Sequence, residues 1–274
     1  MSRMAKNALL LGLSFGLMSL SSLAQSNDGN MYLVTDYMKV EPQAYGDYIS
    51  LELDHWAKIH QARADNGKII GWHLYQVVYP GGSKHDFNFV TVTLYDSFSK
   101  IDDDWSGMLD WPETLGMTLD ELYGRTMNTR EWVDSSLWVL NDMVPVEGLA
   151  DYAEVNYMKV KEGNLANYLE MESEWWKPLH QAMKDQGTRA GWGLYELVLP
   201  RGSGLPYTCA TVDFHHSFDT VAGGNLAAAI LAAYPDADEG DMEDMTEETL
   251  KARSMVRTEL WRLVGSVLPT PEEE

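Results

Sequence analysis

The sequence has 274 residues, with 42 acidic and 20 basic side chains and a formal net charge of −22 at pH 7. A surface this acidic repels nucleic acid and anionic lipid, which argues against any function that requires binding to DNA or RNA. The single cysteine, Cys209, has no partner for an intrachain disulfide, and a chain of this length buries enough surface to be stable without one.

The N-terminal segment has the pattern of an export signal. Arg3 and Lys6 precede an apolar stretch over residues 8–20, which is shorter than the roughly 20 residues that cross a bilayer. Ser22 and Ala24 then form a small-x-small cleavage motif. We therefore expect a signal peptide over residues 1–24 and a periplasmic or secreted protein with no membrane contact after cleavage. The alternative is an uncleaved membrane anchor.

A strand and a long helix are expected next. Residues 32–40 are rich in β-branched and aromatic side chains and are followed by Pro42, a pattern typical of a strand that ends there. A helix is predicted over residues 44–66, with Gly67 in the position of its C-terminal cap.

Two further strands, a helix and a short strand complete this first unit. The strands are predicted over residues 69–79 and 87–95, and the turn-forming residues 80–83 lie between them. The Thr118-x-x-Glu121 pattern predicts the capped start of a second helix. A short strand is expected around residues 137–140.

The same pattern is then repeated. The segment from Tyr37 to Ser83 recurs from Tyr157 to Ser203 at a constant offset of 120 positions (157 − 37). Matching motifs include Trp56 and Trp176, His60 and His180, and Gly71-Trp72 and Gly191-Trp192. A repeat of this length is one supersecondary unit used twice.

The last strand recurs at an offset of 123 positions (260 − 137), since Leu137-Trp138 is matched by Leu260-Trp261. The chain is therefore divided into a first unit over residues 25–143, a linker over 144–151 and a second unit over 152–268. An acidic tail over 269–274 follows.

The order strand, helix, strand, strand, helix, strand is the βαββαβ order of ferredoxin-like domains, in which both helices cover one face of a four-stranded sheet. The predicted fold class is therefore α+β. The second unit would cover the open sheet face of the first, so that two sheets close into one barrel with a central cavity. In element order and duplication the chain resembles the dimeric α/β-barrel superfamily, in a tandem-duplicated form.

That resemblance implies a range of functions. Members of the superfamily include cofactor-independent monooxygenases, haem-degrading enzymes, chlorite dismutases, small-molecule isomerases and stress-responsive proteins. Similarity of fold indicates where a site should lie and says little about its chemistry.

Alternation along the strands predicts which side chains face the barrel interior. In the third strand we expect Val90, Val92 and Leu94 to face the helices. The side chains expected to face the interior include Phe87, Phe89, Tyr207 and Cys209 and the candidate site residues Tyr37, Lys39, His73, Tyr75, Tyr95, Tyr157, Lys159, Tyr195, Thr211, Asp213 and His215. Such an aromatic interior with a few polar groups is typical of a small-molecule pocket.

The second unit has the more polar interior in this prediction. Asp213 and His215 would share a strand face, where a carboxylate orients an imidazole as a general base requires. The candidate catalytic set is therefore His215 as base, Asp213 as its orienting partner, and Lys159 with Tyr157 or Tyr195 to stabilise negative charge. The alternative is a salt-bridged polar layer at the mouth of the barrel.

His60 and His180 are two further candidates for contacts with a ligand. Each follows a repeated tryptophan by one turn of the predicted long helix. The alternative is a stripe that packs the helix on the sheet. Pro178 is expected to bend the second long helix and to re-aim His180.

No metal site is predicted, because the sequence contains no zinc-type cluster of cysteine and histidine. No bound cofactor is expected either, although haem is an alternative suggested by the resemblance. The iron ligand would then be His60, His73, His180 or His215.

The sequence thus predicts an exported barrel that binds a small hydrophobic or aromatic molecule, as a cofactor-independent oxygenase or isomerase-like enzyme. The alternatives are a haem-binding barrel, or a non-catalytic ligand-binding or stress-related protein with two equivalent half-sites. A monomer or weak homodimer is expected, because the two units already cover each other.

Overall fold

The computed structural model describes residues 30–82, 84–102 and 115–271, so the predicted signal peptide lies outside the described residues. The described residues form eight antiparallel strands that close into one barrel. The strands of the first unit are β1 (Met31–Val40), β2 (Gly71–Tyr79), β3 (Phe89–Tyr95) and β4 (Arg130–Val144). Those of the second unit are β5 (Tyr152–Val160), β6 (Gly191–Leu199), β7 (Cys209–His215) and β8 (Arg253–Val267).

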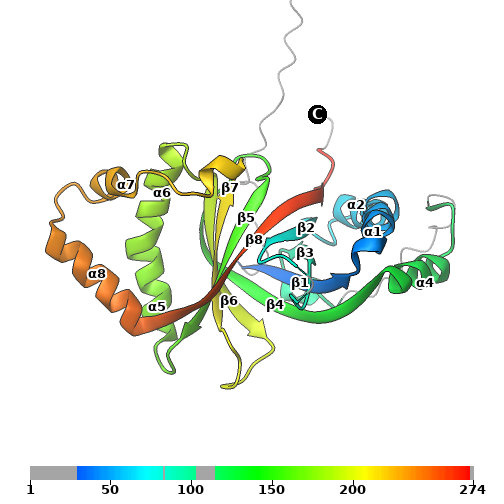
Figure 1. Ribbon diagram of the computed structural model, residues 1–274, viewed down its shortest axis with the longest axis horizontal. Helices are drawn as coiled ribbons and strands as arrows, with labels where there is room; N and C mark the ends of the chain where they lie inside the picture. Colours follow the sequence, from blue (N-terminus) through cyan, green and yellow to red (C-terminus); the bar gives the residue numbers. More distant parts are fainter. Residues whose placement is uncertain (1–29, 83, 103–114, 272–274) are drawn as a thin grey trace, which may run out of the picture.

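The order of strands around the barrel confirms the predicted α+β fold. Each unit contributes one four-stranded sheet, β4-β1-β3-β2 in the first and β8-β5-β7-β6 in the second. Two seams join the sheets, one between β2 and β8 and one between β4 and β6. The two units therefore share one interior (the lumen) rather than standing apart (Figure 1).

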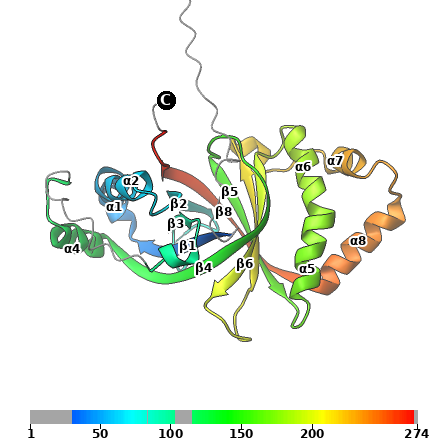
Figure 2. The ribbon, with the colours of Figure 1, turned by 180° about the vertical axis from the view of Figure 1, so that it is seen from behind.

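Helices cover the outside of the barrel on two opposite sides, as Figures 1 and 2 show. The first unit has α1 (Tyr45–Leu51), α2 (Ala57–Asp65) and α4 (Leu119–Thr129). The second has α5 (Leu165–Met171), α6 (Lys177–Asp185), α7 (Leu226–Ala233) and α8 (Glu239–Ala252). Short 3-10 turns occur at Pro42–Ala44, Phe98–Lys100 and Phe218–Thr220.

Each predicted long helix contains a widened turn. A π-helical segment, Glu52–Trp56, connects α1 to α2, and its counterpart Glu172–Trp176 connects α5 to α6. Pro178 is the second residue after the second π segment, where the helical hydrogen-bond ladder already changes register. Because the first unit has the same turn without a proline, Pro178 is not needed to produce it.

The last strand of each unit is much longer than the predicted short strand. β4 and β8 each have 15 residues, because each pairs with two different neighbours. In β4, residues 130–140 pair with β1 and residues 137–144 pair with β6 of the other unit. The start of α4 agrees with the prediction, since Thr118 Oγ1 accepts a hydrogen bond from the backbone N–H of Glu121 at 3.2 Å.

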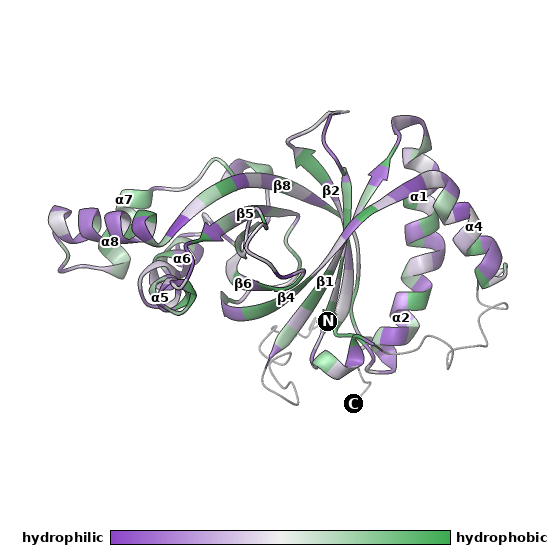
Figure 3. Ribbon diagram, turned by 90° about the horizontal axis from the view of Figure 1, so that it is seen from below, coloured by the Kyte–Doolittle hydropathy of each residue, from purple (hydrophilic) through white to green (hydrophobic). Residues whose placement is uncertain are grey.

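Apolar side chains are buried on both faces of the sheets. One cluster fills part of the lumen and contains Tyr37, Tyr75, Val92 and Tyr157. Separate clusters lie between each sheet and its helices, around Trp72 in the first unit and Trp192 in the second. Figure 3 shows apolar residues along the barrel strands, whereas the helices carry alternating polar and apolar bands. None of the described helices has the length and apolar character needed to cross a membrane.

Candidate ligand-binding site in the barrel

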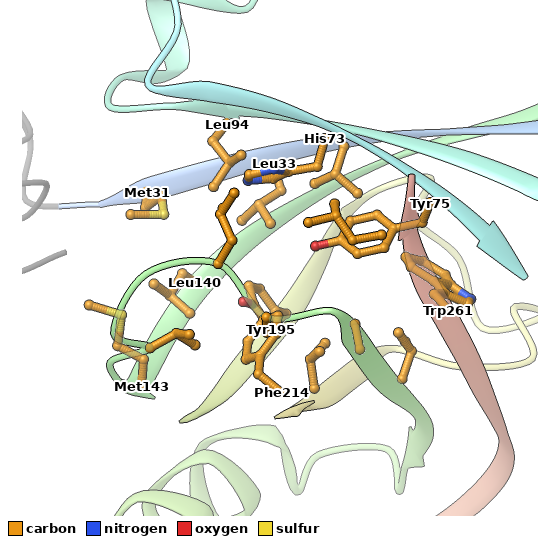
Figure 4. Close-up of a pocket in the computed structure, with 18 of the residues that line it drawn as sticks. Met31, Leu33, His73, Tyr75, Leu94, Leu140, Met143, Tyr195, Phe214 and Trp261 are labelled. Carbon is orange, nitrogen blue, oxygen red and sulfur yellow. The ribbon is translucent and has the colours of Figure 1, made fainter. Parts of the chain in front are cut away.

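A cavity of about 610 Å³ occupies one end of the lumen. Its wall is almost entirely apolar, and it includes residues of the segment between β4 and β5 and residues that follow β8. Figure 4 shows part of the lining, which includes Met31, Leu33, Leu94, Leu140, Met143, Phe214 and Trp261. A pocket of this size and composition suits a small hydrophobic or aromatic molecule.

Two matched tyrosines supply hydroxyl groups to this apolar wall. Tyr75 of β2 and its counterpart Tyr195 of β6 both line the cavity. Neither hydroxyl has a hydrogen-bond partner among the described residues. Burial raises the pKa of both phenols, so both remain protonated at neutral pH and can donate a hydrogen bond to a ligand.

The two units differ at the matched positions His73 and Gly193. His73 lines the cavity, and its Nδ1 lies 2.9 Å from Ser266 Oγ. Burial lowers the pKa of His73 to about 4, so the imidazole is neutral at pH 7. Gly193, its counterpart, leaves the space that Tyr195 uses, since a Cβ there would lie 2.6 Å from the Tyr195 hydroxyl.

The inner end of the cavity is closed by a second tyrosine pair, Tyr37 and Tyr157, whose hydroxyls are hydrogen-bonded to each other. Tyr37 also accepts a hydrogen bond from Thr35 Oγ1 at 3.2 Å. Tyr157 donates a long hydrogen bond of 3.5 Å to Glu259 Oε2. Burial raises the pKa of both phenols.

Glu259 is the one acidic side chain in this inner group, and it is fully buried. Its Oε2 accepts a hydrogen bond from Trp261 Nε1 at 2.9 Å. Its Oε1 lies 3.0 Å from Arg257 Nε and 3.4 Å from His85 Nε2. The Arg257 guanidinium also lies 4.7 Å from the centre of the Tyr157 ring. A buried carboxylate is thus paired with two cationic or cation-forming groups.

Sequence reasoning missed this group. A signal was available, because the matched positions differ in charge: Ser136 corresponds to Glu259, Asp134 to Arg257 and Leu205 to His85. These differences fall on the last strand and on the hairpin between the second and third strands.

The predicted orientation of β3 and β7 is wrong. Val90 and Val92 pack in the lumen with Tyr37, and Leu94 lines the cavity, whereas Phe89 and Tyr95 pack against the helices. Both faces of these strands are buried, one by the opposite sheet and one by helices. The alternation of side chains therefore does not reveal which face is the inner one.

The correction moves Asp213, His215, Thr211 and Tyr95 out of the lumen and onto the helical side. Asp213 Oδ1 lies 3.0 Å from Arg189 Nη1 and 3.6 Å from His180 Nδ1. Burial, partly offset by Arg189, raises the pKa of Asp213 to about 6.

His215 has other partners than Asp213. Its Nε2 lies 3.6 Å from Glu154 Oε2, and its Nδ1 lies 3.1 Å from Thr220 Oγ1. The predicted catalytic set is therefore not assembled in the lumen.

Lys39 and Lys159 do not line the cavity either. Each lies at the end of its strand and donates to backbone carbonyls of the neighbouring hairpin, Lys39 to His85 and Lys159 to Ser203 and Leu205. The predicted lumen positions of Tyr37, His73, Tyr75, Tyr157 and Tyr195 agree with the structure.

His60 and His180 lie between helix and sheet. Each imidazole stacks on a tryptophan with ring centroids 4.8 Å apart, His60 on Trp72 and His180 on Trp192. Burial and a neighbouring arginine lower the pKa of both histidines. This arrangement matches the alternative of helix-to-sheet packing.

The residues around the lumen fit haem poorly. Of the four histidines that the sequence offers as iron ligands, His73 alone lines the cavity, and no lysine or arginine lines it to pair with the haem propionates. Over the residues that the structure describes, no group of three or more potential metal ligands is found.

The comparisons with known proteins reveal similarity of structure. No family model and no curated protein matches the chain. A proposed monooxygenase from Fusobacterium nucleatum subsp. nucleatum has a TM-score of 0.55 and 11% identity, covering 87% of this chain and 94% of that chain. A second proposed monooxygenase, from Lactobacillus acidophilus NCFM, has a TM-score of 0.54 and 6% identity, covering 87% and 96%.

A haem-binding protein from Thermus thermophilus has a TM-score of 0.46 and 8% identity, covering 85% of this chain and 91% of that chain, which is too low a similarity to bear on whether this chain binds haem. At these identities the likeness concerns the fold. The chain therefore has the fold of the dimeric α/β-barrel proteins, with both halves of the barrel carried by one polypeptide.

Proposed function

We propose that the protein binds one small hydrophobic or aromatic molecule in the lumen. The observation that carries this proposal is the apolar cavity of about 610 Å³ shared by the two units. The free hydroxyls of Tyr75 and Tyr195 and the neutral imidazole of His73 would provide its polar contacts. A ligand with one or two oxygen acceptors on an apolar frame fits this lining best.

A single shared lumen favours one ligand per chain over two equivalent half-sites. The test is a titration with N-phenyl-1-naphthylamine, an uncharged fluorophore whose emission rises in apolar surroundings. We expect saturation at one equivalent per chain. Val212→Phe, which fills the cavity from β7, should weaken binding at least tenfold.

The matched control is Val256→Phe, at an exposed position of β8 outside the lumen. It should leave the affinity unchanged. Equal affinity of Val212→Phe and the unaltered protein would place the fluorophore elsewhere and contradict the proposal.

A catalytic form of the same proposal is a cofactor-independent oxygenase or an isomerase acting on the bound molecule. The fold shared with two proposed monooxygenases supports a search for oxygen-dependent turnover. For the haem alternative, a Soret band in the visible spectrum of the purified protein would be the deciding measurement.

Export is a further part of the proposal, supported by the basic and apolar pattern of residues 1–24. Cleavage after Ala24 predicts a mature chain that starts at Gln25. The intact mass of the protein recovered from the periplasm or medium would test both the cleavage and the location.

A further inference from the structure

A connected series of hydrogen-bonding side chains crosses the inner end of the lumen. Trp138 Nε1 donates to Thr35 Oγ1 at 3.1 Å, and Thr35 donates to Tyr37. The Tyr37 hydroxyl is bonded to that of Tyr157, which donates to Glu259 Oε2. Glu259, which accepts from Tyr157, thus stands at one end of this series, and Trp138 of the opposite wall stands at the other.

His85 lies beside the other carboxylate oxygen of Glu259, Oε1. Its Nδ1 contacts the backbone oxygen of Phe87, which only accepts, so Nδ1 carries a proton. Its Nε2 faces Glu259 Oε1 at 3.4 Å. Arg257 Nε lies 3.0 Å from the same oxygen, so Oε1 is the side of the carboxylate that faces the positive charge.

Oε2 is the carboxylate oxygen of Glu259 whose hydrogen-bond partners line the lumen. Its partners are Trp261 and Tyr157, and both of these side chains line the cavity. The matched tyrosine, Tyr37, has Thr35 in place of a carboxylate partner. A carboxylate that can accept a proton therefore lies beside Tyr157, whereas no carboxylate occupies the matched position beside Tyr37.

We propose that Tyr157 and Glu259 form an acid–base pair that abstracts a proton from a carbon acid, such as an enolisable ketone, bound at the inner end of the lumen. This inference rests on the proposed ligand site. Tyr157 is the residue that contacts the ligand, and Glu259 acts through it.

The proton and electrons balance as follows. The C–H bond beside the carbonyl breaks, its electron pair remains on the ligand as an enolate, and the proton moves to the Tyr157 oxygen. Tyr157 passes its own proton to Glu259 Oε2, which becomes neutral. Return of a proton to the same or another carbon restores the carboxylate, which gives exchange or isomerisation with no other reactant. Tyr75 and Tyr195 offer hydroxyl donors for the enolate oxygen on the same lumen.

The test uses 2-tetralone, a small aromatic ketone with acidic C–H bonds, in D₂O with the full-length protein. NMR follows loss of the C1 proton signal, and quenching of tryptophan fluorescence measures binding separately. We expect exchange faster than in buffer alone. Glu259→Gln and Tyr157→Phe should slow it at least tenfold while the ketone still binds, and Tyr37→Phe should have a smaller effect than Tyr157→Phe.

The matched control is Glu172→Gln. Glu172 is as buried as Glu259 and also lies beside a tyrosine and an arginine, Tyr168 and Arg253, but on the helical side of the sheet. The rate of ketone proton exchange with Glu172→Gln should stay within twofold of the rate with the unaltered protein.

Two results would overturn the inference and leave the proposed function intact: binding of the ketone without faster exchange, or exchange that Glu259→Gln and Tyr157→Phe do not slow. If Glu259→Gln does not fold, Tyr157→Phe decides alone. Failure of the ketone to bind would contradict the proposed function, and the inference with it.

Discussion

At the scale of single residues, two glutamates outside the lumen are buried and have a raised pKa. Glu52 and Glu172 occupy matched positions in the two π segments and are 4% and 3% exposed. Burial raises the pKa of each carboxyl to about 7, although a neighbouring arginine and tyrosine partly oppose the shift. The folded chain therefore holds protons on these carboxyls at a pH where the unfolded chain has lost them.

This proton retention predicts a pH-dependent difference between the protein and its Glu52→Gln variant. Because the folded pKa lies above the ordinary value of 4.5, the contribution of Glu52 to stability is present below pH 4.5 and is lost as the pH rises through about 7. The variant keeps a neutral side chain throughout. We expect it to gain up to about 3 kcal/mol in unfolding free energy relative to the unaltered protein between pH 4 and pH 8.

Urea denaturation across this pH range measures the difference. The histidines whose pKa is lowered by burial, such as His60 and His73, have the opposite pH dependence, but they are common to both proteins and cancel. A constant difference between pH 4 and pH 8 would show that Glu52 is ionised in the folded chain over the whole range.

Residue identity alone did not reveal the polar centre of the lumen. Glu259 lies 174 positions from His85 in the sequence (259 − 85), and the two meet only because β8 crosses to the sheet of the first unit and pairs with β2. Asp213 and His215 were predicted to act as a pair because they lie two positions apart on one strand. Their strand turns them towards the helices, and each finds its own partners there.

At the scale of elements, glycines mark where strands and helices approach closely. A Cβ on Gly191, at the start of β6, would lie 2.7 Å from the backbone oxygen of Val144 and 2.6 Å from Val146 Cγ2. A backbone atom cannot give way without moving the strand. We expect Gly191→Ala to destabilise the protein by about 1–3 kcal/mol in urea denaturation.

Gly124 provides the matched control within a helix. It lies inside α4, and a Cβ there would meet nothing within 4 Å. Gly124→Ala should stabilise the protein by about 0.5–1 kcal/mol, because alanine loses less backbone entropy than glycine in a helix. A loss of stability in Gly124→Ala comparable to that in Gly191→Ala would contradict this distinction.

The elements themselves could be predicted well because their signals are local. Strand and helix patterns, the Thr118 cap and the 120-residue offset together specified two ferredoxin-like units and their closure. The lengths of β4 and β8 could not be predicted in the same way, since their outer halves are ordered by pairing with the other unit. Which face of β3 is inner also depends on tertiary packing.

At the scale of the whole molecule, the two seams make each unit depend on the other. β2 pairs with β8 and β4 with β6, so separation of the units would expose four strand edges and the lumen lining. We therefore expect a single unfolding transition in calorimetry, with equal calorimetric and van't Hoff enthalpies.

The matched tryptophans test this coupling. Trp138 of the first unit and Trp261 of the second are both buried in the lumen. Trp138→Ala and Trp261→Ala should each lower the unfolding free energy by about 3–5 kcal/mol. Each variant should therefore shift the midpoint of the whole transition to a lower temperature. Two separate transitions, of which each variant moves one, would show that the units unfold independently.

Fusion of the two halves also changes what evolution can place beside the barrel axis. In an assembly of two identical subunits every wall is encoded once, so a carboxylate close to the twofold axis would always stand opposite its own duplicate. Joining the genes removes that constraint, and this chain has Glu259 on one side and Ser136 on the other. A carboxylate with no counterpart across the barrel axis is thus an arrangement that a fused chain can have and that two identical subunits cannot.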